Sequence, residues 1–186
     1  VVLGSKVHKP SAPKLGPMFS QVVSTLFSNI SKFQDTWIKG KAGKECQVFG
    51  QLSYKEPQGL SIDYKDLKRK AVEGFLKEER MLTSILPLPH YNIVKEMHAK
   101  GRWNIGSRLW TKILYDFIHA YEISENREAV IEALKPVYFA RAASFYRQTL
   151  DMTHQEAEEK IVNQAKLFHK GKGYLVNRFQ QKLAWS

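Results

Sequence analysis

Apolar side chains recur at spacings of three and four along most of the chain, which is the pattern of a helix with one buried face. The first stripe predicts a helix over 17–38 and contains Phe19, Val22, Val23, Leu26, Phe27, Ile30 and Phe33. Similar stripes predict further helices over 61–85, 90–100, 107–121, 126–149, 153–170 and 174–183. We therefore expect a mainly α protein with six or seven helices.

Local signals indicate where several of these helices begin and end. Asn126 is suited to cap a helix because its side chain can accept a hydrogen bond from an otherwise unpaired backbone N–H. Thr153 and Glu156 have the spacing of a capping box. Pro136 lies inside a helical stripe and predicts a kink. The two glycines of 171–173 predict that the preceding helix ends there.

Two segments rich in glycine and proline, 1–16 and 40–59, interrupt the helical pattern and are expected to be loops. Within the second, 46–52 could form a short strand, but no partner strand is evident. Beyond Leu3 the chain lacks the alternation of strands and helices that indicates a parallel sheet. The start, Val1-Val2-Leu3-Gly4, resembles the end of a buried strand and has no initiator Met. A processed N-terminus would explain this, but we expect the back half of a larger protein.

Composition fits one folded domain, or one domain with a long appendage. The 186 residues are 43% hydrophobic and 12% aromatic, and aromatic rings supply much of the area that a core buries. No stretch approaches the roughly 20 consecutive apolar residues of a membrane-spanning helix. The single Cys46 excludes an internal disulfide framework and a CxxC-type zinc site. It is compatible with a reducing compartment, and we expect a cytoplasmic location.

Charge narrows the choice of partners only partly. The net charge is +11, from 29 Lys and Arg against 18 Asp and Glu. Such a surface attracts nucleic acids, phosphorylated metabolites or acidic lipid headgroups. The lysines are interspersed with acidic residues rather than gathered in one run, which argues against nucleic acid. Acidic pairs such as Glu78-Glu79 are interpreted as parts of solvated helix faces.

The common motifs for binding a nucleotide or activating a nucleophile are missing from the sequence, namely GxGxxG, the P-loop, GxSxG and HExxH. His8 is the histidine with the most suggestive surroundings, because its Gly/Pro loop also carries Lys6, Lys9 and Lys14. A neutral imidazole can ligate a divalent metal, and lysines can neutralise phosphate oxygens. From spacing alone, a solvent-exposed loop histidine is the default interpretation.

Cations also adjoin large rings at Arg102-Trp103 and at Arg108 beside Trp110. Aromatic rings with arginines nearby can stack nucleic-acid bases. Trp110 lies on a predicted core face, however, so core packing is the favoured interpretation. Arg141 and its neighbours likewise fit a packed helix interface better than an active site.

Six segments carry a family resemblance through their order and spacing. They are 2–8 (VLGSKVH), 15–18 (LGPM), 114–117 (LYDF), 134–145 (LKPVYFARAASF), 156–159 (EAEE) and 174–176 (YLV). Together they resemble the carboxy-terminal half of the glucosyl-3-phosphoglycerate synthase family. These are retaining, metal-dependent glycosyltransferases of the GT-A type, related to mannosylglycerate synthases.

The resemblance implies a fold and a division of the chain. The helices would form the C-terminal helical portion of an α/β GT-A glycosyltransferase whose nucleotide-binding domain is absent from this chain. Residues 1–16 would be the end of the catalytic domain, with a metal and phosphate loop. Residues 17–186 would be the helical domain.

The resemblance also implies site residues. His8 would ligate a divalent metal, Mg²⁺ or Mn²⁺, together with an Asp-x-Asp motif of the nucleotide domain. Lys6, Lys9 and Lys14 would contact substrate phosphates, and no residue of this chain is assigned a catalytic role. Lys6 stands where the family usually has Arg, and Val2 where it has an acidic residue. A lysine supplies charge there but not the bidentate fork of an arginine.

The activity implied is transfer of glucose, or mannose, from a nucleotide sugar to 3-phosphoglycerate or a similar acceptor, with retained configuration. The metal would offset charge on the departing diphosphate. The 186 residues contain no Asp-x-Asp, so the chain alone is expected to be inactive. A homodimer through the long helices is expected, with no nucleic acid and no membrane span. The alternatives are a stand-alone basic helical module that binds nucleic acid and a protein-interaction domain.

Overall fold

The computed structural model describes residues 15–39 and 62–183. Helices form most of this range, and the described residues contain no strand. The prediction of a mainly helical chain with six or seven helices is therefore confirmed. The helices are α1 (Leu15–Lys32), α2 (Gln34–Lys39), α3 (Tyr64–Ile85), α4 (Leu88–Ala99), α5 (Ser107–Ile123), α6 (Arg127–Thr149) and α7 (His154–Leu183).

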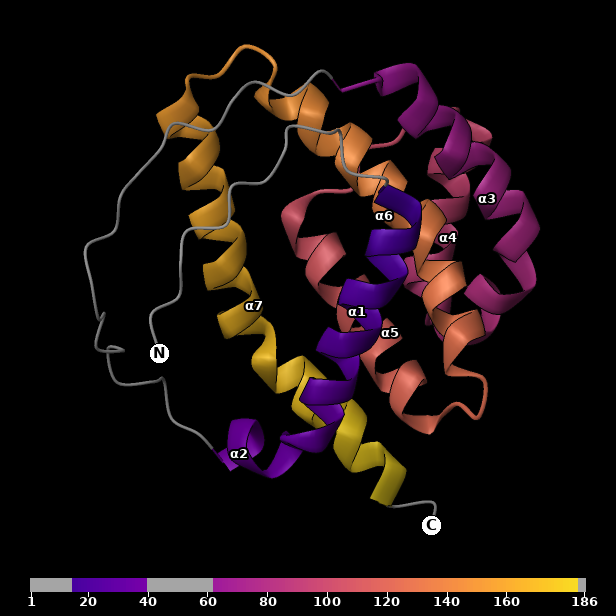
Figure 1. Ribbon diagram of the computed structural model, residues 1–186, viewed down its shortest axis with the longest axis vertical. Helices are drawn as coiled ribbons and strands as arrows, with labels where there is room; N and C mark the ends of the chain where they lie inside the picture. The colour runs from indigo at the N-terminus through magenta and orange to yellow at the C-terminus, as the bar shows by residue number, and fades with distance from the viewer. Residues whose placement is uncertain (1–14, 40–61, 184–186) are drawn as a thin grey trace.

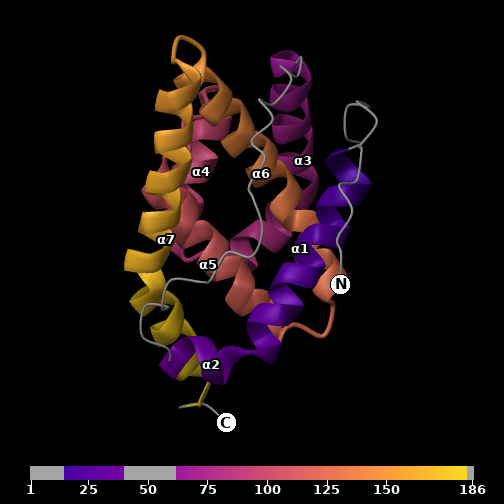
Figure 2. The same cartoon turned by 60° about the vertical axis from the view of Figure 1, so that its left-hand side comes forward.

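Helix α6 is the centre of the arrangement (Figure 1). It packs along α3 and also contacts α5 and α1, while α7 packs along α5 and α4 packs on α3. Figure 2 shows α2 crossing the C-terminal end of α7. There the rings of Trp37 and Phe179 meet edge to face, with their centroids 5.4 Å apart.

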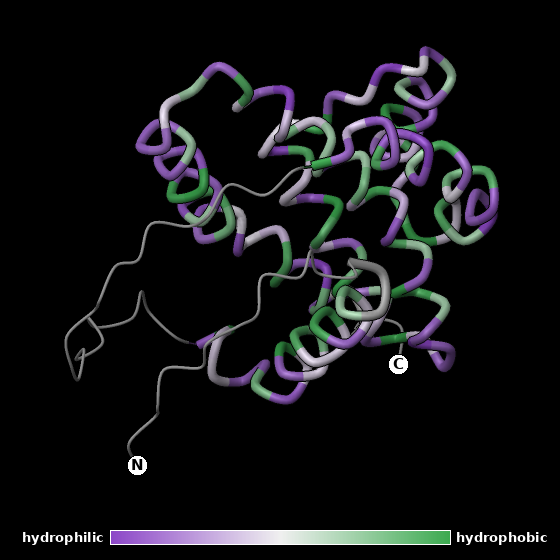
Figure 3. Tube along the Cα trace, turned by 45° about the horizontal axis from the view of Figure 1, so that its top comes forward, coloured by the Kyte–Doolittle hydropathy of each residue, from purple (hydrophilic) through white to green (hydrophobic). Residues whose placement is uncertain are grey.

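The core lies where α3, α5 and α6 face one another. Hydrophobic and hydrophilic positions alternate along the Cα trace (Figure 3). Helix α3 buries one face, whereas the central α6 is buried around most of its circumference. Burial of one such aliphatic or aromatic side chain contributes about 1.5–3 kcal/mol. Side chains exposed by 2% or less include Phe75, Leu82, Ile113, Phe117, Ile118, Ile131, Leu134 and Val137.

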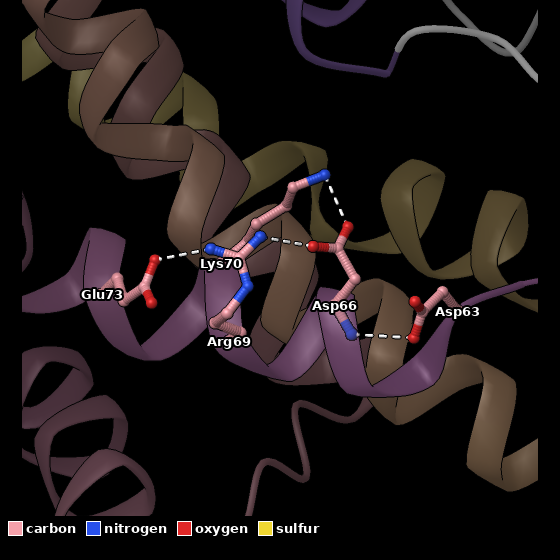
Figure 4. A network of polar contacts seen from close by, with 5 residues as sticks. All are labelled: Asp63, Asp66, Arg69, Lys70 and Glu73. Carbon is pink, nitrogen blue, oxygen red and sulfur yellow. Dashed lines mark hydrogen bonds and ion pairs between the residues drawn. The ribbon is translucent and has the colours of Figure 1, made fainter.

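The N-cap predicted at Asn126 is confirmed, and the structure shows a further N-cap at Asp63. Asp63 begins α3 by accepting a 2.9 Å hydrogen bond from the Asp66 backbone N–H (Figure 4). Asn126 caps α6 through a 3.0 Å bond from the Ala129 N–H. These bonds satisfy backbone donors that lack a partner within the helix.

The capping box at the start of α7 is also present. The Thr153 backbone N–H donates to Glu156 Oε2 at 2.7 Å, and the Glu156 N–H donates to Thr153 Oγ1 at 3.3 Å. Two otherwise orphan donors are therefore paired reciprocally, as the spacing of these residues predicts.

The prediction of one helix over 17–38 is wrong in detail, because the chain forms α1 and α2 with a break at Phe33. Trp37 turns back across the break, and its Nε1–H donates to the carbonyl of Ile30 at 2.7 Å. The bend also brings Trp37 onto Phe179. The apolar spacing alone would allow one continuous helix through Phe33, but the chain bends there and packs Trp37 against α7.

The predicted end of a helix at 171–173 is wrong as well, because α7 runs unbroken to Leu183. Gly171 lies against α5, where an added Cβ would come 3.1 Å from Thr111 Cγ2 and 3.2 Å from Tyr115 Cε2. The glycine therefore permits two helices to approach closely rather than ending one. A glycine inside a helix costs about 1 kcal/mol relative to alanine, which tertiary packing can offset.

Helix α6 also runs through Pro136 without a break, and the kink expected there stays a prediction. Gly74 of α3 faces this proline, and an added Cβ at Gly74 would lie 2.9 Å from Pro136 Cβ. The close packing of α3 on α6 at this point therefore depends on a residue without a side chain. None of the described helices is long and apolar enough to cross a membrane.

Candidate functional site

A basic pocket of about 240 Å³ lies between α5 and α7. Arg108 and Lys112 of α5 and Lys170 of α7 supply its charges, and all three side chains belong to exposed residues. Among the described residues, no Asp or Glu lines the pocket, and no carboxylate forms an ion pair with these three cations. The other lining residues are Thr111, Tyr115, Leu167, Gly171 and Tyr174.

The polar groups at the base of this pocket already have partners. Thr111 Oγ1 donates to the Ser107 carbonyl at 2.9 Å and accepts from Gln164 Nε2 at 3.0 Å. The Tyr115 hydroxyl donates to the carbonyl of Phe168 at 2.5 Å. Burial raises the pKa of Tyr115 to about 12, so the hydroxyl keeps its proton and remains a donor at neutral pH. The base is therefore fixed, and charge is concentrated at the rim.

Arg141 lies behind one wall of the pocket and is only 8% exposed. Its guanidinium donates to the Ile105 carbonyl at 2.9 Å, and to Ser107 Oγ and Gln164 Oε1 at 3.3 Å. Among the described residues, no carboxylate pairs with it. Burial lowers the pKa of Arg141, because the low-dielectric surroundings disfavour its charged form. A guanidinium nevertheless stays protonated in a protein, so a positive charge is held behind the pocket.

A buried polar cluster lies on the other side of Tyr174. Asp116 of α5 is fully buried, and Tyr174 of α7 donates to its Oδ1 at 2.6 Å. His90 Nδ1 of α4 forms a 2.7 Å hydrogen bond with Asp116 Oδ2. Arg178 Nε lies 3.4 Å from Asp116 Oδ1, which is an ion-pair distance without hydrogen-bond geometry. One carboxylate therefore ties three helices together.

The cluster fixes Tyr174 as a hydrogen-bond donor and sets how the His90 ring is oriented. Burial, and then the hydrogen bond to Asp116, raise the pKa of Tyr174 well above its usual range, so Tyr174 remains the donor in this pair. A histidine held through Nδ1 by a carboxylate has its ring orientation fixed, as in many metal-ligating and general-base histidines. His90 is the ring oriented in this way, with 12% of its side chain exposed.

A second cavity, of about 260 Å³, is almost entirely apolar and lies between α1, α5 and α6. Met18, Val22 and Leu26 of α1 lie one turn apart and are each 46–57% exposed. Trp110 of α5 also lines this cavity and is only partly buried. It packs against the core, as expected, while part of its surface remains accessible.

The residues predicted from the family resemblance lie outside the described part of the chain. These are His8, as a metal ligand, with Lys6, Lys9 and Lys14. The described residues include no group of three or more His, Cys, Asp or Glu side chains that could hold a metal ion.

The other sequence interpretations have mixed outcomes. Arg141 and Ser144 are buried in a helix interface, as predicted. Trp103 is buried and Arg102 is exposed. Sequence reasoning missed Arg108, Lys112 and Lys170 as a group, although the spacing of the first two, four residues apart on one helix, was a visible signal.

Searches against family models, curated proteins and solved structures returned no match to the chain.

Proposed function

We propose that this chain is the C-terminal helical portion of a metal-dependent, retaining glycosyltransferase that resembles glucosyl-3-phosphoglycerate synthase. The complete enzyme would move glucose, or mannose, from a nucleotide sugar to 3-phosphoglycerate or a similar phosphorylated acceptor. This chain would complete the metal site with His8 and support the phosphate contacts of Lys6, Lys9 and Lys14.

One observation carries the proposal. Asp116 belongs to the LYDF segment and Tyr174 to the YLV segment, two of the segments on which the resemblance rests. They are 58 residues apart in the chain, yet a buried hydrogen bond of 2.6 Å joins them. A third segment, 134–145, belongs to the central helix α6 and includes the buried Arg141. Residues that share a resemblance therefore also share contacts in the interior.

The helices would serve the reaction by holding the preceding loop. Leu15 begins α1 directly after the segment that contains His8 and Lys14. Helix α1 is in turn anchored on α6, because the rings of Phe19 and Tyr138 pack with centroids 4.5 Å apart. A loop joined to an anchored helix can be held in position for substrate.

The chemistry would be divided between chain and metal. A bound Mg²⁺ or Mn²⁺ supplies Lewis-acid stabilisation of the departing diphosphate. His8 would contribute an imidazole nitrogen, and the three lysines would bring positive charge to the phosphate oxygens of two anionic substrates.

The test uses the complete natural protein, with the gene read upstream of Val1. We expect an upstream domain with an Asp-x-Asp motif, and transfer from a nucleoside diphosphate glucose to 3-phosphoglycerate that requires Mg²⁺ or Mn²⁺. His8→Ala should lower the metal-dependent rate by about 100-fold or more, because the metal loses a ligand. His169→Ala is the matched control, since His169 is an exposed histidine of α7 and should leave the rate unchanged.

Three outcomes would contradict the proposal. They are a reading frame that starts at Val1, a complete protein without transfer activity, and a His8→Ala enzyme with normal metal dependence. Binding of nucleic acid that weakens steeply with salt would then favour the basic-module alternative. A stable complex with another protein, without ligand binding, would favour the interaction-domain alternative.

A further inference from the structure

We propose that the α5–α7 pocket binds a small phosphorylated molecule the size of a sugar phosphate, with Arg108, Lys112 and Lys170 holding its phosphate group. This goes beyond the proposed function, because it gives the helical unit a ligand site of its own. The described residues that line the site belong to α5 and α7.

Without a bound anion, the three cations of the pocket repel one another. Arg108 and Lys112 are four residues apart on α5, where like charges face each other and destabilise a helix. Arg108 also lies in the first turn of α5, where the helix dipole disfavours a cation. Lys170 adds a third positive charge from α7. A bound phosphate would relieve this repulsion.

A second pocket of the same molecule provides an internal comparison. The cavity between α3 and α6 is also lined by three lysines, but three glutamates accompany them. Lys135 pairs with Glu132 at 2.5 Å, and Lys77 lies 3.5 Å from Glu78. In the α3–α6 cavity the glutamates offset the charge of the lysines, whereas the described lining of the α5–α7 pocket has cations and no carboxylate. Anion binding is therefore expected in the α5–α7 pocket and not in the α3–α6 cavity.

Arg141 gives independent evidence that the pocket binds an anion. It is 8% exposed and has no carboxylate partner among the described residues, which is unusual because buried charges are normally paired. Its guanidinium reaches Gln164, which in turn donates to Thr111 at the base of the pocket. A phosphate in the pocket would supply the negative charge that this buried group lacks.

The base and the volume of the α5–α7 pocket indicate what the uncharged part of the ligand is like. The hydroxyls of Thr111, Tyr115 and Tyr174 are already hydrogen-bonded, so the base offers mainly carbon surface. A ligand would therefore place its charged end at the rim and a compact body over the tyrosines. The volume of about 240 Å³ is below the roughly 300–1,000 Å³ of typical ligand pockets, which suits a sugar phosphate better than a dinucleotide.

To test this, the chain is titrated separately with ribose 5-phosphate, inorganic phosphate and ribose, and amide NMR spectra are recorded at each step in the presence of EDTA. We expect ribose 5-phosphate to bind more tightly than inorganic phosphate, and ribose not to bind. The amides of Thr111 and Gly171 should shift. EDTA removes divalent metal, so metal-dependent binding at His8 does not contribute, and His8→Ala should bind ribose 5-phosphate normally. The amide shifts distinguish the α5–α7 pocket from phosphate contacts at Lys6, Lys9 and Lys14.

Charge-reversal variants locate the site. Lys112→Glu and Lys170→Glu, on different helices, should each weaken binding by about tenfold or more, because each adds repulsion at the phosphate. Arg80→Glu is the control, since it changes net charge equally at an exposed position of α3. It should change affinity by less than about twofold, because salt screens distant charges. Circular dichroism and melting curves would check that each variant is folded.

The proposal fails if ribose 5-phosphate shows no saturable binding with a Kd of about 1 mM or tighter. It also fails if Arg80→Glu weakens binding as much as Lys112→Glu, or if the shifted amides lie away from α5 and α7. Binding of an oligonucleotide without binding of ribose 5-phosphate would overturn it in favour of a nucleic-acid surface. All of these results are independent of transferase activity.

Discussion

Tyr174 of α7 donates a 2.6 Å hydrogen bond to the fully buried carboxylate of Asp116 on α5. The same carboxylate reaches His90 of α4. Three helices from separate parts of the chain thus converge on one side chain. A charge buried at such a junction is tolerated only when its partners are present, so the junction should be sensitive to the loss of any of them.

Asp116→Ala should destabilise the protein by about 3 kcal/mol or more, because it leaves the Tyr174 hydroxyl and the His90 ring without their shared partner. Tyr174→Phe removes a single donor and should cost about 1–2 kcal/mol. Urea unfolding would measure both. Asp151→Ala, at an exposed residue, is the control and should change stability by no more than about 0.5 kcal/mol. Equal effects of Asp116→Ala and Asp151→Ala would show that the junction does not stabilise the fold.

Gly171→Ala and Gly173→Ala form a matched pair on one helix. Both gain helix propensity, which is worth up to about 1 kcal/mol. At Gly173 an added Cβ would have no atom of the described residues within 4 Å, so this variant should be more stable than the wild type. At Gly171 the Cβ would press on Thr111 and Tyr115 at 3.1–3.2 Å, and the gain should be reduced or reversed. Thermal melting would rank the variants, and an equal gain at both positions would contradict the close contact of α5 and α7.

Gly74→Ala should be destabilising despite the same gain in propensity. An added Cβ would lie 2.9 Å from Pro136 Cβ, an atom fixed to the backbone and unable to rotate away. Helices α3 and α6 would have to separate, and such overpacking typically costs about 1–3 kcal/mol. Denaturant unfolding against Gly173→Ala would measure the difference. A stabilised Gly74→Ala would mean that α3 and α6 can move apart at little cost.

The capping box of α7 should make stability depend on acidic pH. The backbone N–H and then the hydroxyl of Thr153 hold the pKa of Glu156 below its ordinary value of 4.5. The folded-state pKa is therefore below the unfolded one. The stabilisation is complete above about pH 4.5 and is lost as the pH falls through the lower folded value.

Glu156→Gln should test this dependence. The difference in melting temperature between wild type and variant should be largest near neutral pH and should shrink below pH 4.5. Glu159→Gln, at an exposed position of the same helix and outside the capping box, is the control. A difference that stays constant from about pH 7 to about pH 3 would rule out the carboxylate as the source.

Local features of the fold could be predicted because they depend on near neighbours in the chain. Asn126 and Thr153 cap their helices as predicted, since a cap bonds to a backbone group only two or three residues away. The 3.6-residue period identified the helices because each has to bury one face. The same period could not reveal the break at Phe33, which depends on the contact of Trp37 with Phe179.

The candidate site was only partly predictable for the same reason. The resemblance directs attention to Lys6 and His8, which lie outside the described residues. The spacing of Arg108 and Lys112 places them on one helix face, but nothing local relates them to Lys170. Their convergence depends on how α5 and α7 cross.

The sequence by itself determined which segments are helical, how several helices begin, and that the surface is strongly basic. Only the tertiary structure decided that Gly171 is a contact rather than a helix end, and that Asp116 is buried with its partners. It also decided that three cations meet with no carboxylate among the described residues around them. The physical reason is the distance along the chain over which each interaction acts. Capping and periodicity act within a few residues, whereas burial and charge pairing depend on segments that become neighbours only when the helices pack.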